Sequence, residues 1–216
     1  MNTRFRLSIA VTSLFALAFL FAGRVGAVSF SYSSTVGSFI SFPGDTTFSF
    51  TPAVDNFQVT SGAASGFLGE ITGTFTIGTI STIGSLSTAP VTGTGGFVIS
   101  DGTFDLTATL TWADIQQLGG GGSLNVGGVV NLTSVTYSGS NPALKALATA
   151  GAGIDVLSFQ FTPPVSLATL SNGPGPNQTS FSGAVSAPDG GTTAGLLSFA
   201  LLGVEVMRRR IKSAAA

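Results

Sequence analysis

The chain of 216 residues contains no Cys and no His. Without Cys it has no disulfide framework, so a folded domain must be held together by its core alone. Without His it lacks the most usual general base near neutral pH and the commonest transition-metal ligand. These absences exclude a Ser-His-Asp triad and most zinc sites. We therefore expect a protein that is not an enzyme and that has no cofactor.

Positive charge is almost missing from the middle of the chain. Of the eight Lys and Arg residues, only Lys145 lies between residues 28 and 187. The same span carries seven acidic residues, namely Asp45, Asp55, Glu70, Asp101, Asp105, Asp114 and Asp155. Such an acidic body repels phosphate backbones, so we expect no binding to nucleic acid.

The remaining cations lie at the two ends, and those at the start belong to an export signal. Arg4 and Arg6 precede an apolar stretch over residues 7–22, and small residues lead up to Ala27. This order predicts a secretory signal peptide over residues 1–27, helical in its apolar part and cut by signal peptidase after Ala27. An uncleaved N-terminal anchor stays open as an alternative because Arg24 lies between the apolar stretch and the cleavage site. Both alternatives imply export.

The C-terminal end of the chain has three parts in order. A turn, Pro188-Asp189-Gly190-Gly191, interrupts any preceding structure because Pro fixes φ and Gly permits positive φ. A mostly apolar stretch of 16 residues, 192–207, follows. Arg208, Arg209 and Arg210 close it, as expected of the cytoplasmic end of a membrane segment. A comfortable span needs about 20 residues, so we expect a transmembrane helix that anchors the chain only transiently. The alternative is an amphipathic helix packed on the domain.

This segment resembles the PEP-CTERM class of bacterial sorting signals, and within it the variant named VPDSG-CTERM. Residues 187–191 match the eponymous box, with Ala187 in place of Val and Gly190 in place of Ser. The resemblance implies recognition by an exosortase, a membrane transpeptidase, with cleavage near Pro188, Asp189, Gly190 and Gly191. It also implies a bacterium that makes exopolysaccharide, and a protein delivered to the cell envelope or the extracellular matrix.

The body between these signals shows the alternation of β-strands. In residues 103–112, Phe104, Leu106, Ala108, Leu110 and Trp112 alternate with polar residues throughout, which predicts a strand with one buried face. Further strands are expected at 46–50, 56–60, 71–77, 96–100, 124–137, 154–161 and 179–185. A change of phase within 124–137 predicts a β-bulge near Thr133 and Ser134.

Turns and helices are few. Asp101-Gly102 suits a two-residue hairpin turn. One helix is expected over residues 143–150, with Asn141 as its cap, Pro142 at its first position and Gly151 at its end. Residues 112–119 offer one further helical turn.

Together these patterns predict an all-β domain over residues 28–186, an antiparallel β-sandwich of the jelly-roll type with eight to ten strands and one short helix. A solenoid ranks second because no fixed repeat period is present. The full organisation is then a signal peptide (1–27), the sandwich (28–186), the sorting signal (187–212) and a tail (213–216).

Only weak signals for a binding site lie in the body. Asp101 and Asp105 are weak Ca²⁺ candidates, because carboxylates and loop carbonyls are the oxygens that Ca²⁺ prefers. They are more typical of a turn and of a solvated strand face, and we favour that interpretation. Trp112 lies on the apolar face and is expected in the core, which leaves Tyr32 as the better candidate for stacking on a sugar ring.

We therefore expect an exported, non-catalytic surface or matrix protein that is sorted by an exosortase. Its partners during export are signal peptidase, the exosortase and the membrane, and afterwards extracellular polysaccharide. The alternative is a secreted carbohydrate-binding, lectin-like module with a Ca²⁺-assisted site.

Overall fold

A computed structural model describes residues 28–119 and 126–187, and the two expected terminal helices lie outside these ranges. The described chain forms fifteen strands and two short helices, α2 and α3. The strands are β1 (Ser29–Ser34), β2 (Phe39–Phe42), β3 (Thr47–Thr51), β4 (Phe57–Val59), β5 (Leu68–Thr72), β6 (Thr74–Ile77), β7 (Ser81–Ile83), β8 (Leu86–Thr92), β9 (Gly95–Ser100), β10 (Asp105–Trp112), β11 (Asp114–Leu118), β12 (Val126–Thr136), β13 (Ala152–Phe159), β14 (Asn177–Thr179) and β15 (Phe181–Ser186). The helices are α2 (Pro142–Ala150) and α3 (Leu167–Asn172).

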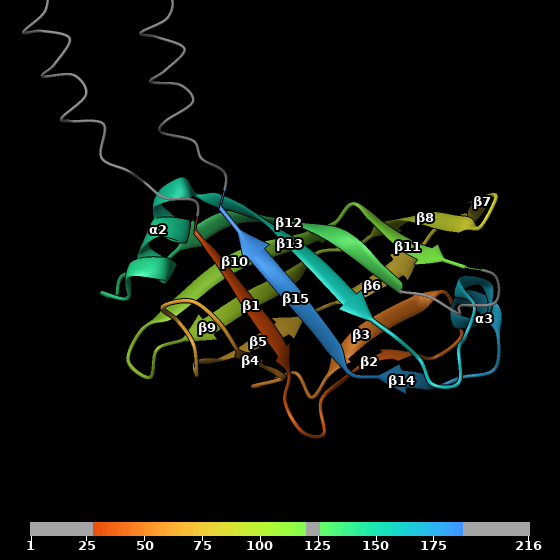
Figure 1. Cartoon of the computed structure of the whole chain (residues 1–216), viewed down its shortest axis with the longest axis horizontal. Coiled ribbons are helices and arrows are strands. Elements are labelled where there is room, and N and C mark those ends of the chain that lie inside the picture. Colours follow the sequence, from red (N-terminus) through yellow and green to blue (C-terminus); the bar gives the residue numbers. More distant parts are fainter. Residues whose placement is uncertain (1–27, 120–125, 188–216) are drawn as a thin grey trace, which may run out of the picture. The chain divides into compact units, whose positions relative to one another are not determined.

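Eight of the strands form a closed antiparallel barrel (Figure 1). Their order is β10-β9-β5-β4-β1-β15-β13-β12, and β12 pairs with β10 to complete the ring. The first strand of the body lies beside the last, with Ser29 opposite Ser186 and Tyr32 opposite Gly183. Closure leaves none of these eight strands as a free edge along the ring.

The other strands continue the same sheet beyond β12, in the order β11-β8-β6-β3-β2-β14, with β11 paired to β12 and β7 paired to β8. Two long stretches of chain pass between the barrel and this extension, β5 into β6 and β8 into β9. Both bend at glycines, and Gly73 and Gly93 have φ values of 114° and 118°. A side chain on Gly73 would also meet the neighbouring bend, because its Cβ would lie 2.8 Å from Gly95 Cα. The corner therefore depends on glycine.

Inward-facing side chains fill both parts with one core. Aromatic rings dominate it. The Phe48 and Phe75 rings stack with centroids 5.3 Å apart, and the Trp112 ring meets Phe48 edge-on at 5.0 Å. Trp112 is 5% exposed, so its predicted place in the core is confirmed. Burial of this aromatic area is the main stabilising contribution available to a domain without disulfides.

The prediction of a β-sandwich was right about the class and wrong about the architecture. The chain is mostly β and antiparallel, but one sheet closes on itself instead of two sheets packing face to face. Alternation along a strand identifies its buried face and not its neighbours. The pairing of β10 with β12, which joins the two ends of the row of eight strands, decides between the two architectures.

Two of the three predictions of local structure were correct. Helix α2 is confirmed, with the Asn141 side chain capping it and Gly151 ending it at a φ of 70°. The β-bulge is also confirmed, since Ser134 has a φ of 53° where the register between β10 and β12 shifts. The helical turn over 112–119 is wrong, because β11 occupies most of that range and pairs with β8 and β12.

Three details differ from the alternation pattern. Phe104 is 45% exposed and precedes β10, because residues 101–104 form the turn and Ser100 pairs with Asp105. The expected two-residue turn is thus a four-residue one. The expected strand over 71–77 is divided at Gly73 into β5 and β6. Neither described helix has the length and apolar character required to cross a bilayer.

Candidate functional site

The first and last described residues of the body meet at one end of the barrel. Beyond the Ser29–Ser186 pair, the Ala187 amide donates a hydrogen bond of 2.9 Å to the Val28 carbonyl. Both residues also pack against the core as partly buried side chains. The body therefore begins and finishes at one place (Figure 1).

Helix α2 covers the barrel at the same place. Gly153 lies between the helix and β15, since a Cβ on it would be 2.9 Å from Leu147 Cδ1 and 3.2 Å from the Ser186 carbonyl oxygen. The Asn141 side chain additionally donates a 2.8 Å hydrogen bond to the Ala63 carbonyl. We call Val28, Ala187 and α2 together the rim.

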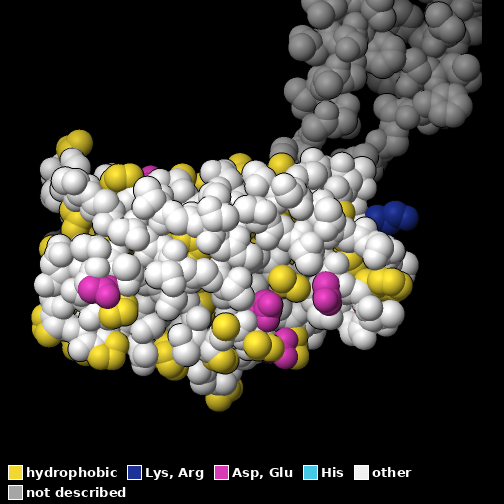
Figure 2. Space-filling model, turned by 180° about the vertical axis from the view of Figure 1, so that it is seen from behind, with side chains coloured by type: hydrophobic (Ala, Val, Ile, Leu, Met, Phe, Trp, Pro, Cys, Tyr) yellow, Lys and Arg dark blue, Asp and Glu magenta, His cyan; other side chains and the backbone are white. Residues whose placement is uncertain are grey.

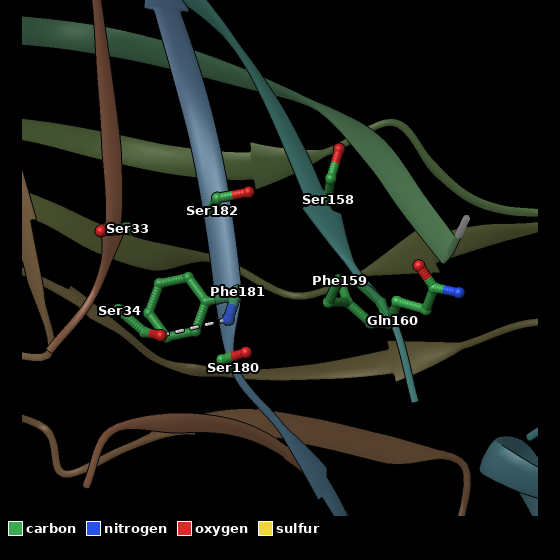
Figure 3. A pocket seen from close by; sticks show the side chains of 8 residues that line it. All are labelled: Ser33, Ser34, Ser158, Phe159, Gln160, Ser180, Phe181 and Ser182. Carbon is green, nitrogen blue, oxygen red and sulfur yellow. Dashed lines mark hydrogen bonds between the residues drawn. The ribbon is translucent and has the colours of Figure 1, made fainter. Parts of the chain in front are cut away.

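A shallow hollow of about 490 Å³ lies toward the other end of β1 and β15. It is lined by Ser33, Ser34, Ser158, Phe159, Gln160, Ser180, Phe181 and Ser182 (Figure 3). Three of its hydroxyls form a row across adjacent strands, because Ser182 on β15 pairs with Ser33 on β1 and with Ser158 on β13. Hydroxyl and amide groups both donate and accept hydrogen bonds, and no charged side chain lines the hollow. This serine hollow suits an uncharged, hydroxyl-bearing ligand.

The Ca²⁺ candidates occupy one turn but do not form a cage. Asp101 Oδ1 accepts hydrogen bonds from the Thr103 and Phe104 amides at 2.8 and 2.7 Å, and Oδ2 accepts one from the Tyr137 hydroxyl. The Tyr137 hydroxyl is the largest cause that lowers the Asp101 pKa, followed by the two amides. Asp105 is exposed at the start of β10. Within 28–119 and 126–187, no three His, Cys, Asp or Glu side chains are grouped to hold a metal ion.

Tyr32 is a core residue, so the expectation that it stacks on a sugar is wrong. Its side chain is 1% exposed, and its hydroxyl donates a 2.6 Å hydrogen bond to Asp155 Oδ2 inside the barrel. Asp155 itself is 0% exposed. Burial raises the pKa of Asp155 to about 7, against the smaller lowering effect of the Tyr32 hydrogen bond. Burial, followed by the nearby Asp155, raises the pKa of Tyr32.

This buried pair was missed from the sequence, although a signal for Asp155 was present. In the stretch IDVLSFQF, Asp155 has the same parity as Leu157 and Phe159 and must share their inward face. Tyr32 is likewise two residues from Phe30 in β1, so the two side chains share the buried face of that strand. We did not predict β1 from the sequence.

Charged side chains are sparse on the outer surface. On the face shown in Figure 2, acidic groups are scattered over a mostly uncharged surface, and hydrophobic side chains form no single large patch. Most of the visible surface is therefore backbone and uncharged polar side chains.

Comparison with known proteins identifies one segment of the chain. Residues 188–211 match the VPDSG-CTERM motif, and no curated protein or solved structure matches the chain. The expected processing and sorting residues lie outside the described ranges, namely Ala27, Pro188, Asp189, Gly190, Gly191, Arg208, Arg209 and Arg210. The motif implies export to the cell surface and processing by an exosortase. The chain thus carries, after its β-domain, a PEP-CTERM-type C-terminal sorting signal.

Proposed function

We propose that this protein is a non-catalytic component of the cell envelope or extracellular matrix, delivered there by its sorting signal. After signal peptidase removes residues 1–27, the apolar segment over 192–207 holds the chain in the inner membrane. An exosortase then cuts near Pro188–Gly191 and releases or transfers the β-domain. The observation that carries this proposal is the VPDSG-CTERM match at residues 188–211.

The composition and surface of the body support a non-catalytic role. The chain has neither His nor Cys, and the serine hollow is lined by serine hydroxyls, one glutamine amide and two phenylalanines, without a charged side chain. A surface of this kind makes weak, repeated hydrogen bonds to the hydroxyls of a polysaccharide matrix. The acidic side chains keep the domain soluble.

Mass spectrometry of the exported protein tests the sorting step. We expect peptides from the body and none covering residues 196–212. An Asp189→Ala variant should keep its C-terminal peptides if the box is read by the enzyme. The Gly190→Ser variant, which restores the Ser of the motif name, is the matched control and should be processed like the natural chain. Exported wild-type protein that retains residues 196–212 would refute the proposal.

A lectin-like function is the second candidate, and the serine hollow favours it. Binding of the purified domain to extracellular polysaccharide would be measured with and without EDTA. Ser182→Leu should abolish binding at the hollow, whereas Thr82→Leu on exposed β7 should leave it unchanged. Chelator-sensitive binding that is lost on Asp101→Asn would instead support a Ca²⁺ site at the β9–β10 turn. Absence of binding in every case would remove this candidate and leave the first.

A further inference from the structure

We propose that two copies of this chain associate through an uncharged outer face of the barrel, formed by the neighbouring strands β12, β13, β15 and β1 (Figure 1). We call the outward side chains of these four strands the uncharged face. They include Val129, Ile154, Val156, Ala184, Ser31 and Ser182. This association is independent of the sorting signal and goes beyond the proposed function.

The barrel keeps its charged side chains away from this face. In the described strands β12, β13, β15 and β1 the single charged residue is Asp155, and it is buried inside the barrel. The other four strands of the ring carry Glu70 on β5 and Asp105 on β10. Lys145, the one cation between residues 28 and 187, lies on α2 at the rim. Figure 2, which views the molecule from behind, shows acidic side chains on that opposite side.

This separation of charge favours a second copy as the partner. Over residues 28–187 each copy carries seven acidic residues and one Lys, so two copies repel one another in most orientations. Contact through the uncharged face keeps Glu70 and Asp105 of both copies out of the interface. A cationic partner would instead be attracted to the acidic side of the ring.

The centre of the uncharged face is apolar. Val129 on β12, Val156 on β13 and Ala184 on β15 form one row across three strands, because Val156 pairs with both of the others. Val156 is 50% exposed, and Ile154 on the same side of β13 is 43% exposed. Removal of such side chains from water is the main favourable contribution to protein association, and the isolated barrel leaves them exposed.

Hydroxyl groups border this apolar centre. Ser31 lies opposite Ala184 at one end of the row, and the next row consists of three serines of the serine hollow, on β13, β15 and β1. An apolar centre with an uncharged polar border is typical of a protein interface. A two-fold axis near Val156 would place the apolar rows of both copies in contact and their serines side by side, so one face serves both copies.

The size of the face predicts a weak, reversible dimer. Four strands about 4.8 Å apart and about six residues long cover roughly 19 Å by 20 Å, or about 400 Å² in projection. A standard stable interface buries about 800 Å² on each partner. We therefore expect dimers at high protein concentration and monomers on dilution.

Sedimentation velocity of the exported protein at increasing concentration tests this association. We expect the wild-type sedimentation coefficient to rise from that of a monomer toward that of a dimer. Val156→Glu places a charge at the centre of the face and should keep the protein monomeric. Thr76→Glu, at an exposed position on β6 outside the ring, adds the same charge elsewhere and should associate like the wild type. Circular dichroism would show that both variants are folded.

The absence of Cys from the chain allows a second test that introduces no charge. Packed sheets lie about 10 Å apart, which is too far for a disulfide, so a short bismaleimide would join the two thiols. We expect it to link Val156→Cys into covalent dimers several-fold more efficiently than Thr76→Cys.

Three results would overturn the association through this face. The first is wild-type protein that remains monomeric at every concentration. The second is equal behaviour of the two Glu variants, or of the two Cys variants, because the contact would then lie elsewhere. The third is a monomeric wild type whose cosedimentation with extracellular polysaccharide is lost in Val156→Glu, because the face would then bind the polysaccharide and not a second copy.

Discussion

The buried carboxyl of Asp155 makes the stability of the barrel depend on pH. Its pKa is about 7 in the folded protein because burial disfavours the charge, whereas an unfolded Asp titrates near 3.8. Between these values the folded state holds a proton that the unfolded state has released. The free energy of unfolding therefore falls as pH rises from about 4 to 7, by roughly 4 kcal/mol in total, and levels off above that range.

Replacement of Asp155 by Asn should remove this contribution. Asn has nearly the same shape, can still accept the Tyr32 hydroxyl and carries no charge at any pH. We expect urea unfolding of Asp155→Asn to show a much smaller loss of stability between pH 4 and pH 7 than the wild type. Asp105→Asn, at an exposed position, is the control and should keep the wild-type dependence. An unchanged dependence in Asp155→Asn would mean that another group is responsible.

Gly183 has no side chain and so leaves room for the Tyr32 ring inside the barrel. A Cβ on Gly183 would collide with the Tyr32 ring atoms, and both residues are buried on facing positions of β1 and β15. Gly183→Ala should therefore lower the free energy of unfolding by about 1–3 kcal/mol, measured by denaturant unfolding. The adjacent, exposed Ser182→Ala should change it by less than about 0.5 kcal/mol. Equal stability of the two variants would contradict the packing described for Tyr32.

At the scale of elements, a single side chain caps the start of α2, whose buried face packs against the core. Asn141 Oδ1 accepts hydrogen bonds from the Ala143 and Leu144 amides, and its Nδ2 group reaches Ala63. This one residue both caps the helix and fastens it to the loop between β4 and β5. No acidic side chain in the first turn assists it.

Asn141→Ala should consequently destabilise the domain by about 1–2 kcal/mol. Thermal unfolding followed by circular dichroism would measure the change. Lys145→Ala, one turn further along on the exposed side, should have little effect on stability and serves as the control. A loss in Lys145→Ala as large as that in Asn141→Ala would indicate that the helix is held by its surface charge instead.

At the scale of the whole molecule, strands from the two ends of the body, β1 and β15, are neighbours in the ring. Because Val28 and Ala187 are in contact, a short linker can join them without strain. A circular permutant joined there and opened between Gly84 and Ser85, in the exposed turn between β7 and β8, should fold to the same barrel. Near-ultraviolet circular dichroism and cooperative unfolding would show this.

The matched control opens the same joined chain between Val130 and Asn131. That position lies in the middle of β12, which pairs with β10, β11 and β13. We expect this permutant not to fold, because the opening interrupts the strand that closes the ring. Failure of the first permutant alongside the second would refute the contact of the two chain ends.

Local features could be predicted from the sequence because their causes are local. The cap, proline and terminal glycine defined α2 within residues 141–151, and the change of phase located the bulge at Ser134. The order of turn, apolar stretch and arginines likewise identified the sorting signal, because these features follow one another directly in the chain. Alternation placed Leu106, Leu110 and Trp112 in the core.

The strand faces, helix α2 and the C-terminal sorting signal, which implies export, could thus be predicted from the sequence. The folded chain was needed to show that the sheet closes, that Tyr32 and Asp155 share a buried hydrogen bond, and that Val28 contacts Ala187. Each of these depends on which strands become neighbours in the folded chain. Period-two alternation is the same for a sandwich and a barrel, because it shows which side chains of a strand are buried and not which strands it pairs with.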